Sequence, residues 1–219
     1  MFVGHYAVAL AAKKMAPKVS LGVLFIAAQF VDLLWPLLLL LGLEHVRIDP
    51  GNTILTPLDF YDYPFSHSLV SAIIWSIVIG LWYFASKRDK SSSVVVAFCV
   101  FSHWILDFVT HRPDLPLAFG KNIYLGLGLW NSPVVTIAIE VSLFILGVVI
   151  YLRTTSPIDH IGNYGFWSLV AVLLLIYISN FIGPPPPNEF SLAIVANAAW
   201  LFVLWAFWVD RHRSIALTN

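Results

Sequence analysis

The run SHWILDFVTH places His103, Asp107 and His111 four residues apart in a segment otherwise apolar enough to lie inside a membrane. An ionisable side chain at that depth is costly unless it is paired, bound to a metal or open to water. Three such side chains on one predicted helix therefore indicate a functional site inside an integral membrane protein.

The rest of the chain has the composition of a membrane protein. Of its 219 residues, 59% are hydrophobic and 11% are charged, and the mean hydropathy is +0.84. A helix needs about 20 apolar residues to cross a bilayer. Apolar runs of that length predict six spans, at 19–43, 66–86, 93–111, 131–152, 164–183 and 190–209.

The stretch from Gly4 to Met15 is amphipathic and too short to span, so we expect an N-terminal half-helix there. The expected fold is an all-α integral membrane protein with about six transmembrane helices. It forms a single membrane domain over 1–219, in which 1–152 carries the site and 164–210, almost free of ionisable residues, serves as scaffold.

Charge predicts the topology. Nine Lys and Arg residues fall on one side of the predicted spans and three on the other, which favours a multi-pass protein of the inner cell membrane with both termini in the cytoplasm. The net charge is zero, without the excess of positive charge typical of nucleic-acid-binding proteins, so no nucleic-acid partner is expected. Cys99 is alone, which excludes an internal disulfide and a cysteine-based zinc site.

Four further ionisable residues fall at membrane depth. His5 lies in the half-helix, and Asp32 lies in the first span, which Pro36 is expected to kink. His67 is expected in the first turn of the second span, and Glu140 lies inside the fourth. With His103, Asp107 and His111, five of the seven ionisable positions are expected in the outer leaflet, and His5 and Asp32 closer to mid-membrane.

The spacing suits a metal cluster. Residues four apart on a helix differ by about 6 Å in rise, so Asp107 can share one ion with His103 and another with His111. Nitrogen and carboxylate ligands without thiolate favour a divalent metal, zinc first, with manganese or iron as alternatives. One cluster would satisfy all seven candidates, namely His5, Asp32, His67, His103, Asp107, His111 and Glu140. Separate hydrogen bonds to neighbouring helices are the plainer alternative, and haem ligation would leave the three acids unexplained.

At PFSHSLV and SHWILDFVTH the chain resembles a bacterial family of membrane-bound metal-dependent hydrolases, over about residues 1–140. The family pattern is an N-terminal histidine, an acid in the first span, a His-Ser pair and a His-x-x-x-Asp helix. Here these positions are matched by His5, Asp32, His67 with Ser68, and His103 with Asp107.

The order of ligands is also similar, more loosely, to that of zinc-dependent phospholipases C and related nucleases, which are all-helical enzymes with three zinc ions. That resemblance implies one ion at Asp32, His67 and His103, a second at His5 and Asp107, and a third at His111 and Glu140, with Asp107 bridging. The sequence departs from it at Thr136, where those enzymes have a histidine, and this puts the third ion in doubt.

Together these features predict a membrane-embedded metal-dependent hydrolase with a two- or three-metal site near the outer leaflet. The expected substrate is a membrane lipid or lipid-linked phosphoester, with Asp32 and Asp107 as catalytic residues and Asp32 a candidate general base. The alternative is a non-enzymatic metal or proton transporter in which the same residues form a relay.

Overall fold

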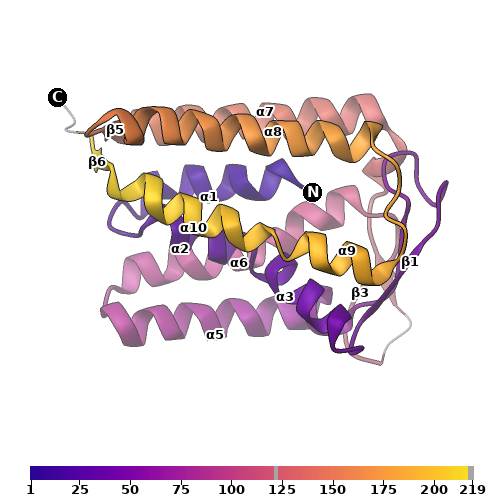
Figure 1. Ribbon diagram of the computed structural model, residues 1–219. Helices are drawn as coiled ribbons and strands as arrows, with labels where there is room; N and C mark the ends of the chain where they lie inside the picture. Colours follow the sequence, from indigo (N-terminus) through magenta and orange to yellow (C-terminus); the bar gives the residue numbers. More distant parts are fainter. Residues whose placement is uncertain (121–122, 217–219) are drawn as a thin grey trace.

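A computed structural model describes residues 1–120 and 123–216 of the chain. The long helices run side by side along one axis, and short two-stranded sheets lie at the two ends of the bundle (Figure 1). The helices are α1 Val3–Met15, α2 Leu21–Ala28, α3 Phe30–Leu40, α4 Pro64–His67, α5 Leu69–Lys87, α6 Lys90–Thr110, α7 Pro133–Thr154, α8 Phe166–Ile182, α9 Glu189–Ala196 and α10 Ala199–Arg211.

The strands form three antiparallel pairs, β1 with β2, β3 with β4 and β5 with β6. The all-helical prediction missed these pairs, of which β1 to β5 lie between the predicted spans and β6 follows the last one. Their bounds are β1 His45–Ile48, β2 Leu58–Asp62, β3 Leu115–Pro116, β4 Tyr124–Leu125, β5 Thr155–Pro157 and β6 Arg213–Ile215.

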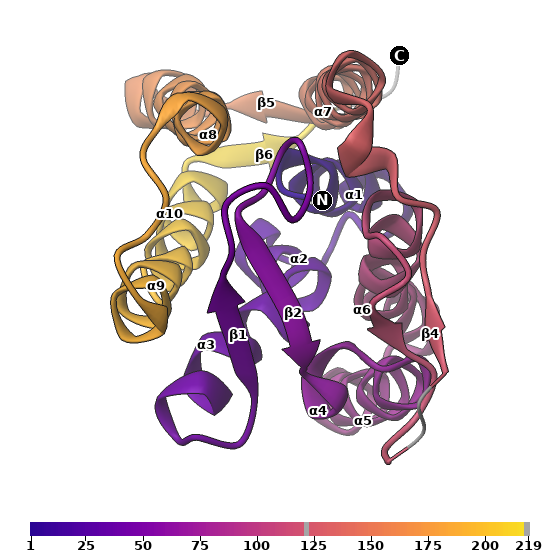
Figure 2. The same ribbon diagram turned by 90° about the vertical axis from the view of Figure 1, so that its right-hand side faces the viewer.

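The two short helices near the start of the chain lie at the centre of the bundle. In the end-on view, α1 and α2 are surrounded by α5, α6, α7, α8 and α10 (Figure 2). Most residues of α1 and α2 are buried, and Tyr6, Leu10, Leu24 and Phe25 are among the largest fully buried side chains. The half-helix predicted from the sequence is therefore part of the core.

Five helical segments are long and apolar enough to cross a membrane, and the bent pair α2–α3 makes a sixth if it counts as one span. They match the six apolar runs in order, and the largely helical architecture is confirmed. The five are Leu69–Lys87, Lys90–Thr110, Pro133–Thr154, Ile161–Ile182 and Glu189–Arg211.

The first predicted span is broken at a different place from the one expected. Helices α2 and α3 meet at an angle of 59° across Gln29, whereas α3 continues through Pro36. The prediction that Pro36 makes the kink was therefore wrong. Gln29 leaves the α-helical conformation, with φ −105° and ψ 9°, and Asp32 falls in the first turn of the new helix.

The start of the second span also differs from the prediction. His67 is the last residue of the separate short helix α4, which begins at Pro64. Ser68 is extended, with ψ 154°, and its hydroxyl accepts a hydrogen bond from the Ser71 N–H at 3.1 Å, so α5 begins only at Leu69. This N-cap separates His67 from α5 and turns it toward the bundle interior.

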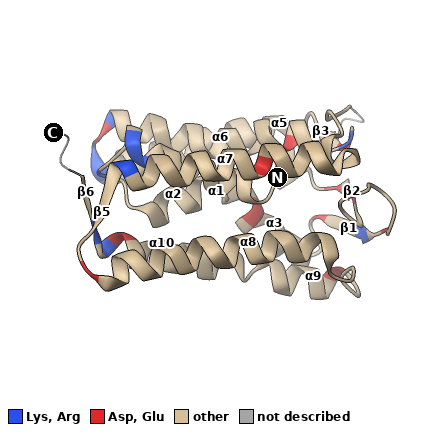
Figure 3. Cartoon of the chain, turned by 90° about the horizontal axis from the view of Figure 1, so that it is seen from above, with Lys and Arg blue, Asp and Glu red and all other residues tan. Residues whose placement is uncertain are grey.

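The two ends of the bundle differ in charge. Most Lys and Arg residues lie at the end that carries β5 and β6, which we call the basic end, while β1 to β4 form the opposite end (Figure 3). The described chain finishes at the basic end, but Met1 is buried inside the bundle. That both termini lie in the cytoplasm stays a prediction.

Close packing fixes α1 against α7. A Cβ atom added to Gly147 would lie 2.6 Å from the carbonyl oxygen of Ala7 and 2.8 Å from its Cα. Only glycine permits two backbones to approach this closely. The approach sets the distance between α7 and the helix that carries His5.

Candidate metal centre

Five of the seven ionisable residues identified in the sequence meet inside the bundle. They come from four helices, with His5 on α1, Asp32 on α3, His67 on α4, and His103 and Asp107 on α6. They form two overlapping groups, His5–His103–Asp107 and Asp32–His67–His103, in each of which the ligand-type atoms lie within 4.8 Å of one another. His103 belongs to both groups, so the two form one continuous site.

Asp107 lies between the histidines. Its Oδ1 is 3.1 Å from Nε2 of His5, and its Oδ2 is 3.1 Å from Nε2 of His103 and 3.9 Å from Nε2 of His67. The amino group of Met1 also contacts Oδ1. Asp107 therefore presents one oxygen to each side of the site, which is the arrangement of a bridging carboxylate.

Asp32 completes the second group and marks its open edge. Its Oδ1 lies 3.4 Å from Nε2 of His67 and 3.5 Å from Nε2 of His103. Its side chain is 35% exposed, against 3% for Asp107. The other members of the site are buried, so Asp32 is the member that an incoming molecule can reach.

The orientation of His103 is fixed by the end of α2. Its Nδ1 donates a hydrogen bond to the carbonyl oxygen of Ala28 at 2.7 Å, directly before the bend at Gln29. In the neutral ring Nε2 then carries a lone pair, and it is buried without a hydrogen-bond partner among the described residues. A lone pair facing the oxygens of Asp32 and Asp107 is unfavourable unless a proton or a metal cation lies between them, and a ring held at Nδ1 with Nε2 facing carboxylates is typical of metal-binding histidines.

His67 is held in a comparable way. Its Nδ1 lies 2.6 Å from the hydroxyl of Ser66, which in turn lies 2.6 Å from Oε2 of the buried Glu44. Burial raises the pKa of the Glu44 carboxyl, while hydrogen bonds from Ser66 and Phe65 act in the opposite direction. Glu44 and Ser66 were not predicted as site residues from the sequence, although a serine directly before a candidate ligand was an available signal.

The ring of His5 stacks on the ring of His103. The two centroids are 3.5 Å apart and the planes are inclined by 1°. The Nδ1 of His5 is buried and has no hydrogen-bond partner within the described chain. The stack brings α1 and α6 together at the site, because each helix contributes one ring.

Glu140 lies on α7 and belongs to neither group of ligand atoms in the part of the chain that the structure describes. Its Oε2 accepts hydrogen bonds from the backbone N–H groups of Phe2 at 2.8 Å and Gly4 at 3.3 Å. These are N–H groups at the start of α1, which have no partner within the helix. Glu140 therefore caps the helix that carries His5.

His111 follows the last residue of α6 and also lies outside both groups of described residues. Its Nδ1 is 2.9 Å from Oδ1 of Asp114, and the Tyr63 hydroxyl donates to the same oxygen at 3.1 Å. Burial, with Asp114 alongside, raises the pKa of Tyr63, so its hydroxyl stays protonated and donates. The ring of Trp130 covers His111 at a centroid distance of 4.1 Å.

No third group of ligand-type atoms forms around His111 and Glu140 among the described residues. Thr136, where the phospholipase-like pattern has a histidine, is buried and donates its hydroxyl to the carbonyl oxygen of Leu129 at 2.6 Å. Asp114, in the loop after α6, is buried against His111 and Tyr63.

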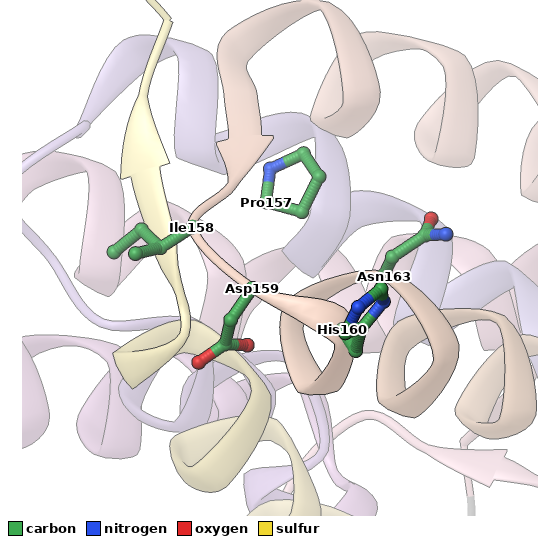
Figure 4. A pocket seen from close by; sticks show the side chains of 5 residues that line it. All are labelled: Pro157, Ile158, Asp159, His160 and Asn163. Atoms are coloured by element: carbon green, nitrogen blue, oxygen red, sulfur yellow. The ribbon is translucent and has the colours of Figure 1, made fainter.

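An open pocket at the basic end is remote from this site. It is lined by Pro157, Ile158, Asp159, His160 and Asn163 (Figure 4). Asp159 is already bonded to the Gly162 N–H at 2.9 Å and to Nδ1 of His212 at 2.6 Å. The described residues of this pocket hold no group of three ligand-type atoms, so the site on α1, α3, α4 and α6 is the stronger candidate.

Comparisons of the chain with protein-family models, with curated proteins and with solved structures gave no match.

Proposed function

We propose that this chain is a multi-pass membrane hydrolase that holds two divalent metal ions, zinc first, and cleaves a lipid phosphoester. The observation that carries the proposal is the convergence of three histidines on two carboxylates with Asp107 between them. The two groups share His103, which suits ions bridged by one carboxylate. His5 and Asp107 would hold one ion, and Asp32 and His67 the other.

A membrane location is supported by the outer surfaces of the long helices. Large apolar side chains are exposed along them, such as Leu81 on α5, Leu146 on α7 and Leu204 on α10, at 62%, 54% and 63%. Such a surface is unfavourable in water and expected against lipid. By the positive-inside rule the basic end faces the cytoplasm, so the site, in the last turns of α6 before β3, lies toward the outer leaflet.

The donor set suits hydrolysis. A divalent cation bound here would supply a Lewis acid and lower the pKa of a coordinated water to about 7. The protein provides two negative charges, histidine rings fixed by Ala28 and Ser66, and a buried wall that excludes bulk water. Asp32, at the open edge, can accept a proton from water or contact the substrate.

The position of the site favours a substrate that is part of the membrane. A lipid head group can reach membrane depth by lateral diffusion, whereas a soluble ester cannot. The transporter alternative requires polar residues that continue to the basic end. Between His5 and the buried pair of Lys13 with Asp210, at 2.9 Å, α1 presents the apolar core residues Ala9 and Leu10.

The experiment is a phospholipase assay on zinc-loaded protein in mixed micelles, with release of the phosphorylated head group followed by mass spectrometry. We expect turnover by the wild type and a loss of about 10²- to 10⁴-fold in Asp32→Asn and Asp107→Asn. The matched control is Asp159→Asn, the same change in the remote pocket, which should keep the wild-type rate. No hydrolysis by metal-loaded wild type, together with zinc uptake into proteoliposomes, would favour the transporter instead.

A further inference from the structure

Glu44 is a buried acid in the segment between α3 and β1. Its side chain is enclosed by the first turn of α4, and the residue is 1% exposed. Its Oε1 accepts the backbone N–H groups of Phe65 at 2.7 Å and Ser66 at 2.8 Å, and its Oε2 lies 2.6 Å from the Ser66 hydroxyl. A carboxylate, which only accepts hydrogen bonds, fits these three donors.

The Ser66 hydroxyl links Glu44 to His67. Its oxygen lies 2.6 Å from the carboxylate on one side and 2.6 Å from Nδ1 of His67 on the other. A hydroxyl has one hydrogen to donate. Because that hydrogen goes to Glu44, the oxygen must accept a hydrogen from Nδ1 of His67.

The direction of these two hydrogen bonds decides which ring nitrogen of His67 carries no hydrogen. With the hydrogen on Nδ1, the lone pair of the neutral ring is on Nε2, which lies 3.4 Å from Oδ1 of Asp32. The carbonyl of Ala28 has the same effect on His103. In their neutral forms, both rings therefore direct an unprotonated nitrogen at the same carboxylates.

We infer that Glu44 is a positioning residue that acts through Ser66 to hold His67 in the tautomer that binds a cation at Nε2. The inference about metal binding rests on the proposed metal centre. The tautomer itself does not, because it can be measured in metal-free protein.

Glu44→Gln tests the direction of the hydrogen bonds without changing the shape of the side chain. The N–H groups of Phe65 and Ser66 require an acceptor, so the amide oxygen must take the place of Oε1. The amide NH₂ then faces the Ser66 oxygen and donates to it. The Ser66 hydroxyl no longer donates to a carboxylate, so its hydrogen is free for Nδ1 of His67. We expect this to move the ring hydrogen to Nε2 and block the metal-binding nitrogen.

Ser66→Ala removes the hydroxyl that links Glu44 to His67, and Ser102→Ala is its matched control. Ser102 also directly precedes a histidine of the site, but its hydroxyl donates to the carbonyl oxygen of Cys99 within its own helix, at 2.7 Å. Ser102→Ala therefore makes the same chemical change beside His103 without breaking a contact to a ring nitrogen. A general effect of losing a buried hydroxyl should appear in both variants.

The measurement is ¹⁵N NMR of metal-free, histidine-labelled full-length protein in detergent, with the His67 signals assigned by their loss in His67→Gln. We expect the Nδ1–H form in wild type and Ser102→Ala, the Nε2–H form in Glu44→Gln and a mixture in Ser66→Ala. Zinc titration of the same samples should show affinity about 10- to 100-fold weaker in Glu44→Gln and Ser66→Ala than in wild type.

Two results separate this inference from the proposed function. If His67 keeps the hydrogen on Nδ1 in both Glu44→Gln and Ser66→Ala, Glu44 does not set the tautomer, even if the wild type binds zinc. If the tautomer changes as expected but the wild type binds no zinc, the positioning role stands and the metal centre fails. Thermal unfolding of each variant checks that the fold is retained, and Ser66→Ala carries the test if Glu44→Gln does not fold.

Discussion

The Glu140 carboxylate accepts the backbone N–H of Phe2 at 2.8 Å, and this contact joins α7 to the start of the helix that bears His5. A negative charge at a helix N-terminus is stabilised by the helix dipole and by the free N–H groups. Glu140 therefore has a role that does not require a metal. It holds the start of α1, and with it His5, against α7.

The first prediction tests whether Glu140 caps helix α1 or binds a metal ion. Glu140→Gln keeps an oxygen that can accept the N–H groups of Phe2 and Gly4, so it should bind zinc nearly as well as wild type. Glu140→Ala removes the cap and should lower the free energy of unfolding by about 0.5–2 kcal/mol and weaken zinc binding through His5. Thermal unfolding and zinc titration in detergent measure both. Complete loss of zinc from Glu140→Gln would mean that Glu140 is itself a ligand.

The second prediction concerns the approach of α7 to α1. Gly147→Ala should push the helices apart, because the new Cβ would lie 2.6 Å from the Ala7 carbonyl oxygen. We expect a loss of about 1–3 kcal/mol in the free energy of unfolding, with weaker zinc binding at the His5 side. Gly165→Ala is the control, since its Cβ would meet only side-chain atoms, of Trp208 at 3.3 Å and Val209 at 3.4 Å, and no backbone atom. Equal stability of the two variants would contradict the packing argument.

The third prediction concerns His111. Because its Nδ1 is paired with Asp114 and it lies outside both groups of ligand atoms among the described residues, His111→Ala should keep the same number of bound zinc ions as wild type. Metal analysis after gel filtration checks this number. The loss of one zinc ion per chain in His111→Ala would instead support a third metal ion at His111 and Glu140.

The fourth prediction concerns metal removal. A ligand that binds only the folded state stabilises it, by about 2.7 kcal/mol when present at 100 times its dissociation constant. Chelation should therefore lower the unfolding temperature of the wild type, and added zinc should restore it. Asp107→Asn should unfold at the same temperature with and without chelator. A chelator effect of equal size in both proteins would show that it does not act through this site.

Much of the helical architecture follows from the sequence because apolar runs of spanning length leave few alternatives. The half-helix was also predictable, since the stretch before Lys13 is apolar but too short to span. Its central position was not, because burial of α1 depends on the packing of α2, α6, α7 and α8 around it. Similarly, proline chemistry favoured a kink at Pro36, whereas the packing of α2 and α3 placed the bend at Gln29.

The candidate site, too, was only partly predictable from the sequence. Residue type and spacing identified His5, Asp32, His67, His103 and Asp107, which the structure brings together. The spacing of four residues equally suggested His111, yet the end of α6 turns it toward Asp114. Glu44 could not be identified from spacing, because it reaches His67 only through the fold of the β1–β2 hairpin and α4.

The most direct test of the metal centre is the metal content of detergent-purified protein by mass spectrometry, with wild type compared to His103→Ala and to His160→Ala. His103 belongs to both groups of ligand atoms, whereas His160 is exposed in the remote pocket. We predict stoichiometric zinc, or manganese or iron in its place, in wild type and His160→Ala, and its loss in His103→Ala. Wild-type protein that is metal-free after growth in metal-replete medium and takes up no added ion would contradict the account.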